Sequence, residues 1–194
     1  MSQNEIKPPE VYVQRPDLPD IYGPVETIKI DVQMKFEISQ QTKILDEVKN
    51  GERKLSNSLE KGNYGEMRTD QDLKEKGYER ISVDRVTDLN DSTHQGIDGV
   101  YYKKGGEPEY LIIDSKFGSA QLGETADGKQ MSESWIDNRL DSAVGKEKAD
   151  EIRMEKIMNS DNVGSFVARV DESGNVTYDK LDSNGNVTER NVQL

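Results

Sequence analysis

The sequence predicts an α/β fold in which helices flank a mixed β-sheet that ends in a C-terminal β-hairpin. Three observations lead to this fold class. A stretch with helical spacing at Tyr64–Lys76 precedes the strands. Tyr110–Phe117 contains an apolar run typical of a buried strand. Gly-Asn and Asn-Gly steps near the C-terminus are typical of tight turns between strands.

Composition indicates that only part of the chain forms a packed core. Of the 194 residues, 32% are hydrophobic and 33% are charged, and this hydrophobic fraction is low for a globular chain. Five of the six prolines lie within residues 1–25, and such sequence does not enter a central strand or helix. We therefore expect an N-terminal proline-rich arm with a helical lead-in at residues 1–57, and one folded domain at residues 58–194.

The lead-in allows two interpretations. Thr27–Ile38 alternates apolar and polar residues, which predicts a strand, although a helix beginning within residues 35–43 is the alternative. Residues 40–61 carry apolar side chains near helical spacing and predict one helix. Gly51 weakens the middle of this helix, and Gly62 ends it.

The next elements follow in close order. The predicted helix at Tyr64–Lys76 has Glu66 in its first turn and is closed by Gly77. Tyr78–Val83 alternates and predicts a strand, and Gly96–Tyr102 predicts another after a polar loop.

The second half continues the alternation of strands and helices. Gly105–Pro108 predicts a turn before the strand at Tyr110–Phe117. Gly118–Gly128 is a polar loop, and Met131–Met158 has the spacing of a helix. Ser165–Lys180 then predicts the C-terminal hairpin.

Residue types exclude several kinds of chemistry. The chain has no cysteine, which excludes disulfides and cysteine-ligated metals, and one histidine, which excludes sites that need two. A formal net charge of −12 argues against a protein that coats nucleic acid. We find neither an apolar run of membrane-spanning length nor an N-terminal secretion signal. If the folded chain acts outside the cell that produces it, we expect another component to carry it there.

Three charged residues form the candidate site. Side chains two apart on a strand share a face, so Asp114 and Lys116 are expected to point the same way, with Leu111, Ile113 and Ser115 towards a core. A hairpin through the preceding turn would bring Asp98 beside them. The alternative interpretation is a surface cluster of ion pairs, although the apolar flanks of Asp114 argue against exposure.

Two carboxylates and a lysine in this arrangement favour a magnesium site. Mg²⁺ is usually held by one or two carboxylates together with waters and substrate phosphate, and we expect Asp98 and Asp114 to supply them. Lys116 would hold the attacking water or the developing negative charge. Glu66 is a third candidate ligand, directly or through water. Its alternative role is that of a helix N-terminal acid favoured by the macrodipole.

The ordered motifs resemble a known family. Lys61–Glu66, Gly96–Val100, Ile113–Lys116 and Asp127–Ile136 resemble the C-terminal toxin domains of bacterial polymorphic toxins, including those of contact-dependent inhibition, which have a PD-(D/E)XK restriction-endonuclease-like core. The resemblance covers roughly residues 58–190. It implies a metal-dependent nuclease that acts on DNA or RNA after delivery into a target bacterial cytoplasm, and a cognate immunity protein.

The resemblance also implies roles for individual residues. The metal-binding acids fall on Asp98 and Asp114, the lysine on Lys116 and the helical glutamate on Glu66. Mg²⁺ is the expected ion, with Mn²⁺ or Zn²⁺ as alternatives. His94, Lys129 and Gln130 are candidates for binding the substrate, although a lone loop histidine often has no role, and Lys129 and Gln130 could instead help to hold the site.

The expected function is phosphodiester hydrolysis by a toxin effector. DNA is favoured slightly, because a metal-dependent core needs no 2′-hydroxyl, and tRNA or other RNA is the alternative substrate. A different class is a non-catalytic binding module that keeps the fold without the chemistry. The Asp- and Asn-rich turns near the C-terminus lack the closing glutamate of an EF-hand, so we do not expect calcium loops.

Overall fold

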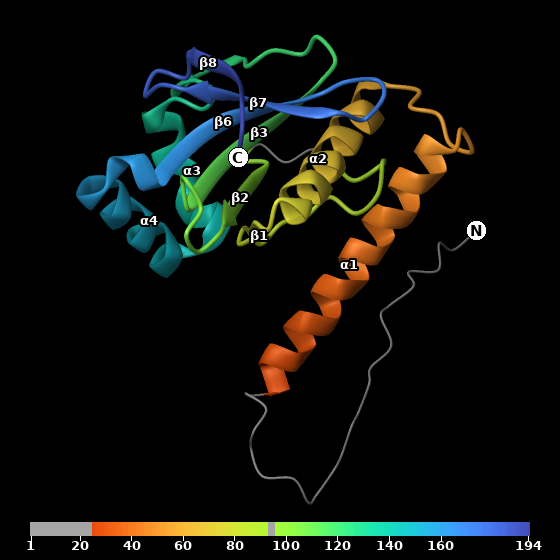
Figure 1. Ribbon diagram of the computed structural model, residues 1–194, viewed down its shortest axis with the longest axis horizontal. Coiled ribbons are helices and arrows are strands. Elements are labelled where there is room, and N and C mark those ends of the chain that lie inside the picture. The colour runs from red at the N-terminus through yellow and green to blue at the C-terminus, as the bar shows by residue number, and fades with distance from the viewer. Residues whose placement is uncertain (1–24, 93–95) are drawn as a thin grey trace, which may run out of the picture.

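The computed structural model describes residues 25–92 and 96–194 and places a twisted sheet among helices (Figure 1). Within these residues no helix is both long and apolar enough to traverse a bilayer. The elements in chain order are α1 (Val25–Lys49), α2 (Ser58–Glu75), β1 (Glu79–Arg80), β2 (Gly99–Tyr102), β3 (Tyr110–Phe117), β4 (Glu124–Thr125), β5 (Gly128–Lys129), α3 (Glu133–Val144), α4 (Lys146–Met158), the 3₁₀ turn η1 (Ser160–Asn162), β6 (Val163–Val170), β7 (Val176–Leu181) and β8 (Val187–Val192).

The main sheet is mixed, as the sequence predicts. Its strand order is β1-β2-β3-β6-β7-β8, and all neighbours are antiparallel except β3 and β6. A parallel pair needs a long crossover connection, and α3 and α4 form part of the crossover from β3 to β6. Two short strands, β4 and β5, form a separate hairpin within this connection.

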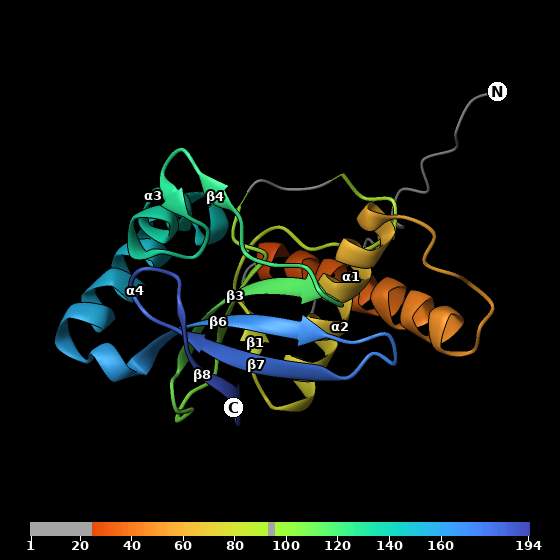
Figure 2. The same cartoon turned by 90° about the horizontal axis from the view of Figure 1, so that it is seen from above.

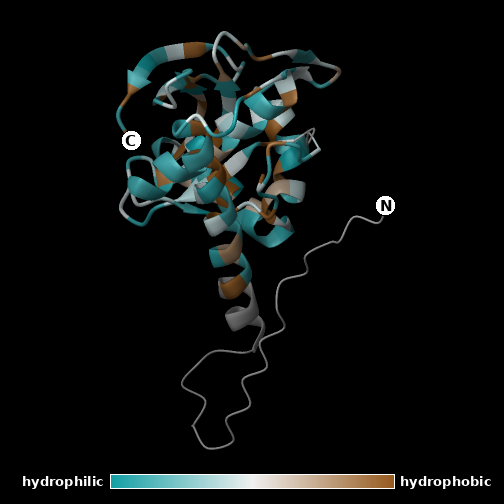
Figure 3. Ribbon diagram, turned by 90° about the vertical axis from the view of Figure 1, so that its right-hand side faces the viewer, coloured by the Kyte–Doolittle hydropathy of each residue, from teal (hydrophilic) through white to brown (hydrophobic). Residues whose placement is uncertain are grey.

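Helices cover both faces of the sheet (Figure 2). On one face Leu73 of α2 packs in a buried cluster with Leu111 and Ile113 of β3. On the other face Ile112 of β3 joins a cluster that includes Trp135 of α3. β3 is therefore buried on both sides, which explains its nearly continuous apolar sequence. Hydrophobic residues gather inside the body of the domain, whereas the outer surfaces of the helices are largely hydrophilic (Figure 3).

The predicted strand at Thr27–Ile38 is wrong, because these residues belong to α1. The alternation of apolar and polar residues does not correspond to a buried face here. Val32 and Met34, two of the apolar residues in this pattern, are exposed. The period of two is thus not evidence of sheet pairing here. Among the described side chains of α1, Ile44 and Leu45 in its last turns join the core and pack with α2, and the rest of the helix projects from the domain (Figure 1).

The single helix predicted at residues 40–61 is also wrong. α1 ends before Gly51, whose φ of 75° is a left-handed conformation that favours glycine. A new helix, α2, begins after Asn57, whose side chain accepts a hydrogen bond from the backbone N–H of Glu60 at 2.9 Å. Gly62 therefore lies inside α2 and does not end a helix.

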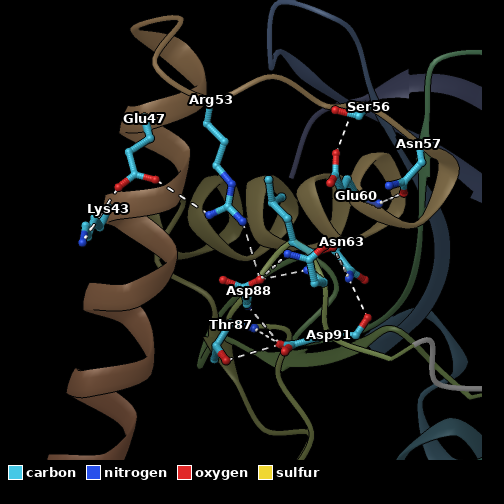
Figure 4. A network of polar contacts seen from close by, with 12 residues as sticks. Lys43, Glu47, Arg53, Ser56, Asn57, Glu60, Asn63, Thr87, Asp88 and Asp91 are labelled. Carbon is cyan, nitrogen blue, oxygen red and sulfur yellow. Dashed lines mark hydrogen bonds and ion pairs between the residues drawn. The ribbon is translucent and has the colours of Figure 1, made fainter. Parts of the chain in front are cut away.

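Polar contacts fasten the connection between α1 and α2 to the loop that follows β1 (Figure 4). Arg53 lies 3.8 Å from Glu47 of α1 and 3.6 Å from Asp88 of that loop. Asn63 of α2 is buried and donates to the backbone carbonyls of two loop residues within 89–91, at 2.9 and 2.8 Å. These bonds hold the loop against α2, on the helix that carries Glu66.

The helix predicted at Met131–Met158 is divided and begins later. Met131 itself has a φ of 67° and precedes α3, and Gly145 with a φ of 79° separates α3 from α4. Left-handed backbone cannot continue an α-helix. The helical spacing was recognisable from the sequence, but the two left-handed residues that limit α3 were not.

Candidate functional site

Strand β3 places the two charged residues of the Asp-x-Lys motif on one face of the sheet. Lys116 Nζ lies 2.7 Å from Oδ2 of Asp114, which is completely buried. Ser115 points to the opposite face, where its hydroxyl donates to that of Thr69 on α2 at 3.0 Å. The alternation predicted for this strand is therefore confirmed.

Asp98 lies immediately before β2, next to the point where the two strands stop pairing. Gly99 is opposite Ile113 in the register of β2 and β3, and Asp98 Oδ2 accepts a hydrogen bond from the backbone N–H of Ser115 at 2.8 Å. Burial, followed by the charges of Asp114 and Glu66, raises the pKa of Asp98 well above its ordinary value. The two aspartates are thus close enough to repel each other when both are ionised.

Glu66 approaches the same place from α2. It lies in the middle of that helix and not in its first turn, so the interpretation as a helix N-terminal acid is wrong. Burial raises the pKa of Glu66 to about 7, and Asp70 and Asp114 add to the increase, whereas Arg80 and Lys116 oppose it. The pKa of Asp114 is raised by burial as well, against the opposing charges of Lys116 and Arg169.

The site therefore combines three carboxyl groups that disfavour one another's ionisation. In the described part of the chain no three acidic or histidine side chains converge at metal-ligand spacing. Other groups of the protein donate hydrogen bonds to two of these carboxylates. Gln130 Nε2 donates to Asp114 Oδ1 at 2.5 Å, and the backbone N–H of Ser115 donates to Asp98. Asp114 Oδ2 has Lys116 as a charge partner but no hydrogen-bond donor in favourable geometry.

This donor set fits Mg²⁺ or Mn²⁺ better than Zn²⁺. Mg²⁺ is commonly held by one or two carboxylates, with waters and phosphate completing its shell. Asp98 and Asp114 can supply that number, and Asp114 Oδ2, a buried oxygen with Lys116 as its charge partner, receives no other donor from the described residues. A catalytic zinc site uses three protein ligands, usually including histidine, and this chain has one histidine.

A buried arginine behind the acids was not found by sequence reasoning. Arg80 of β1 pairs with Asp70 of α2 at 2.7 Å, and the two side chains are 6% and 4% exposed. Arg80 also donates to the hydroxyl of Tyr101 at 3.1 Å and to the backbone carbonyl of Asp98 at 2.7 Å. One signal was present: Asp70 follows Glu66 by four residues, so both lie on one face of α2.

A small cavity between α2, the loop after β1 and α3 is lined by two of the three acids, Glu66 and Asp98, but not by Asp114. Its volume is about 130 Å³. Arg139 of α3 borders it and is held in place, because its guanidinium lies 4.4 Å from the centre of the Trp135 ring and pairs with Asp127 at 2.8 Å. The other lining residues are Glu66, Arg80, Asp84, Val86, Gly96, Ile97, Asp98, Ser142 and Ala143.

The three residues predicted to bind the substrate differ in where the structure places them. His94 lies outside the described residues. Lys129 Nζ donates to the side-chain oxygen of Asn186 in the turn between β7 and β8, at 2.9 Å. Gln130 is half-buried and binds Asp114 directly, so it contacts one of the acids of the candidate site.

We expect the stability of the domain to fall as pH rises through the titration of Glu66. Its pKa is about 7 when folded, against an ordinary value of 4.5, so between these values the folded chain binds more protons than the unfolded chain. The free energy of unfolding must then decrease with increasing pH in this window. Urea unfolding from pH 4.5 to 8 will show a smaller decrease for Glu66→Gln, whereas Glu75→Gln, at an exposed position of the same helix, will follow the wild type. Equal slopes for Glu66→Gln and the wild type would contradict this assignment.

Comparisons with known proteins add no identification. No protein-family model matches the chain, and no curated protein and no solved structure matches it significantly. The function therefore has to be argued from the site.

Proposed function

We propose that this chain is a divalent-metal-dependent nuclease that hydrolyses phosphodiester bonds. The observation that carries the proposal is that Glu66, Asp98 and Asp114 lie near enough for their charges to interact beside Lys116, each with a raised pKa, although they are not at metal-ligand spacing. Like charges gathered at a partly buried place are costly for the fold. A divalent cation relieves that repulsion, and pKa values perturbed in this way are a common feature of functional sites.

The order of elements supports a PD-(D/E)XK core. A helix with Glu66 is followed by β1, then by Asp98 at the start of β2, a hairpin, β3 with Asp114 and Lys116, and then α3. This is the order that the sequence motifs led us to expect. Asp98 and Asp114 also lie where the pairing of β2 with β3 ends, and α2 contributes Glu66.

Each residue has a distinct task in this proposal. Bound Mg²⁺ or Mn²⁺ would neutralise phosphate charge and lower the pKa of a water molecule. Asp98 and Asp114 hold the ion, and Glu66 supports it directly or through water. Lys116, fixed 2.7 Å from Asp114 Oδ2, orients the attacking water or stabilises the negative charge that develops on the phosphate oxygens. Arg139, at the border of the cavity, is available to contact the substrate backbone.

The biological setting that we propose is that of an antibacterial toxin effector. DNA is the favoured substrate and RNA, including tRNA, is the alternative. A cognate immunity protein would protect the producing cell, and a separate delivery system would carry the chain into the target cytoplasm. The net charge of −12 suits a partner with a basic surface.

The proposal is tested with end-labelled DNA and tRNA incubated with the purified chain at pH 7.5. We expect degradation of one substrate with Mg²⁺ or Mn²⁺ and none with EDTA. We also expect that expression in a bacterium without its partner arrests growth and that Asp114→Ala relieves the arrest. If neither nucleic acid is cut in any divalent metal and no heat of metal binding is measured, the chain is a binding module that has the fold without the chemistry.

A further inference from the structure

The segment after the β4–β5 hairpin holds a glutamine against the buried aspartate of β3. Gln130 follows β5 directly, and both the nitrogen and the oxygen of its side-chain amide form hydrogen bonds. Its Nε2 donates to Asp114 Oδ1 at 2.5 Å, and its Oε1 accepts from the backbone N–H of Gly123 at 3.2 Å. The backbone N–H of Gln130 also donates to the carbonyl of Gly123 at 2.9 Å. The side-chain amide is therefore fixed by two hydrogen bonds, and the backbone of the same residue by a third.

The backbone beside this glutamine is held in an unfavourable conformation. Met131 has a φ of 67° although it is not glycine, and its side chain is completely buried in the cluster that contains Trp135. A left-handed residue of this kind is unfavourable and persists where its surroundings impose it. The buried side chain of Met131 therefore anchors the backbone at the residue that follows Gln130.

The turn between β7 and β8 supports this segment from the other side. Glu133 N–H donates to the carbonyl of Ser183 at 2.8 Å. A Cβ atom added to Gly185 would lie 2.8 Å from the carbonyl oxygen of Gln130, closer than such atoms approach. Backbone from the C-terminal part of the sheet thus packs directly on the peptide that carries Gln130.

We propose that Gln130 is a positioning residue that sets the orientation of the Asp114 carboxylate, and that the β7–β8 turn acts on the site through it. This inference rests on the proposed function. With Oδ1 occupied by the amide, Oδ2 is the oxygen left for a cation, and it is the oxygen next to Lys116. Outer-shell bonds of this kind orient metal ligands, and their loss typically lowers metal affinity or activity by about 10–100-fold.

The first test measures the hydrogen bond itself and needs neither metal nor substrate. In the intact chain we expect a side-chain amide proton of Gln130 to exchange with solvent more slowly than those of Gln121, an exposed glutamine of the same connection. Asp114→Ala should bring its exchange rate to that of Gln121. Exchange of Gln130 at the rate of Gln121 in the wild type would overturn the inference, whatever the activity of the chain.

The second test separates positioning from substrate contact. Gln130→Met keeps the size of the side chain and removes the donor. We expect a 10–100-fold loss in Mn²⁺ affinity by calorimetry or in kcat, with KM within about twofold of the wild type, and no change for Gln121→Ala. Unchanged Mn²⁺ affinity and kcat, or a loss confined to KM, would overturn the proposal. Failure of the wild type to bind Mn²⁺ or cut nucleic acid would instead count against the proposed function.

The third test uses the two similar C-terminal turns as a matched pair. Gly174 and Gly185 both have left-handed φ values, 80° and 72°, in the turns that follow β6 and β7. Gly174→Ala meets the side chains of Tyr64 and Arg68, whereas Gly185→Ala meets the backbone of Gln130. Both variants should lose stability to urea, but only Gly185→Ala should lower kcat or Mn²⁺ affinity. Equal kcat and Mn²⁺ affinity in the two variants would contradict coupling through Gln130.

Discussion

Replacement of Lys116 by alanine is expected to reduce phosphodiester cleavage by about 10²–10³-fold, the usual loss when one group that stabilises a developing charge is removed. Lys116 is mostly buried, its side chain being 16% exposed, and its ammonium lies 2.7 Å from Asp114 Oδ2. Its charge is therefore directed at the place where we expect the reaction. Because Lys116 is not a metal ligand, the affinity for Mn²⁺ should change far less than kcat.

A lysine elsewhere on the sheet provides the control. Lys180 is exposed on β7, and Lys180→Ala should cleave at nearly the rate of the wild type. Asp114→Ala should lose Mn²⁺ binding as well as cleavage, which separates the ligand from the lysine. If Lys116→Ala retains a rate within about tenfold of the wild type, Lys116 does not stabilise the transition state as proposed.

Replacement of Arg80 by alanine is expected to destabilise the domain by about 3–5 kcal/mol, the usual cost of leaving one partner of a buried ion pair without compensation. Asp70 would remain buried with the hydrogen bonds from Tyr101 and Gln41 alone. Burial acts to raise the pKa of Asp70, but the charge of Arg80, with help from Arg85, outweighs it and holds the pKa below its ordinary value. The carbonyl of Asp98 would also lose its donor.

Urea unfolding at pH 7 measures this loss. Arg153 is the matched control, because its contacts with Asp141 and Asp150 lie at the surface and Arg153→Ala should cost no more than about 1 kcal/mol. The double variant Asp70→Asn with Arg80→Met removes both charges and should recover part of the stability. A loss below about 1 kcal/mol for Arg80→Ala would show that the pair does not hold α2 against β1.

The arrangement of the site residues on β3 could be predicted from the sequence, because it depends only on the local geometry of a strand. A strand alternates its side chains with a period of two, so Asp114 and Lys116 had to share a face once Tyr110–Phe117 was recognised. The hairpin through Gly105–Pro108 then placed Asp98 beside them, as the antiparallel pairing of β2 and β3 confirms. These inferences needed no knowledge of distant contacts.

The predictions that were wrong, and the contacts that were missed, concern features that depend on tertiary structure or on backbone conformation. The first part of α1 has a strand-like alternation of apolar and polar residues but forms a helix. Gly51 and Gly145 end helices through their left-handed conformation, which the apolar spacing did not reveal. The ion pair of Arg80 with Asp70 joins β1 to α2, and Gln130, which contacts Asp114, is followed by the left-handed Met131. Hydrophobic periodicity in the sequence cannot predict such contacts between polar residues.

The most direct measurement of the central claim is paramagnetic broadening of backbone amide signals by substoichiometric Mn²⁺. We predict that the signals of Gly99, Ser115 and Lys116 broaden first, because they adjoin Asp98 and Asp114. The exposed turns that contain Asp171 and Asp182 serve as internal competitors for the ion. Broadening that begins in those turns, or that leaves Gly99 and Ser115 sharp, would contradict a metal site at the junction of β2 and β3.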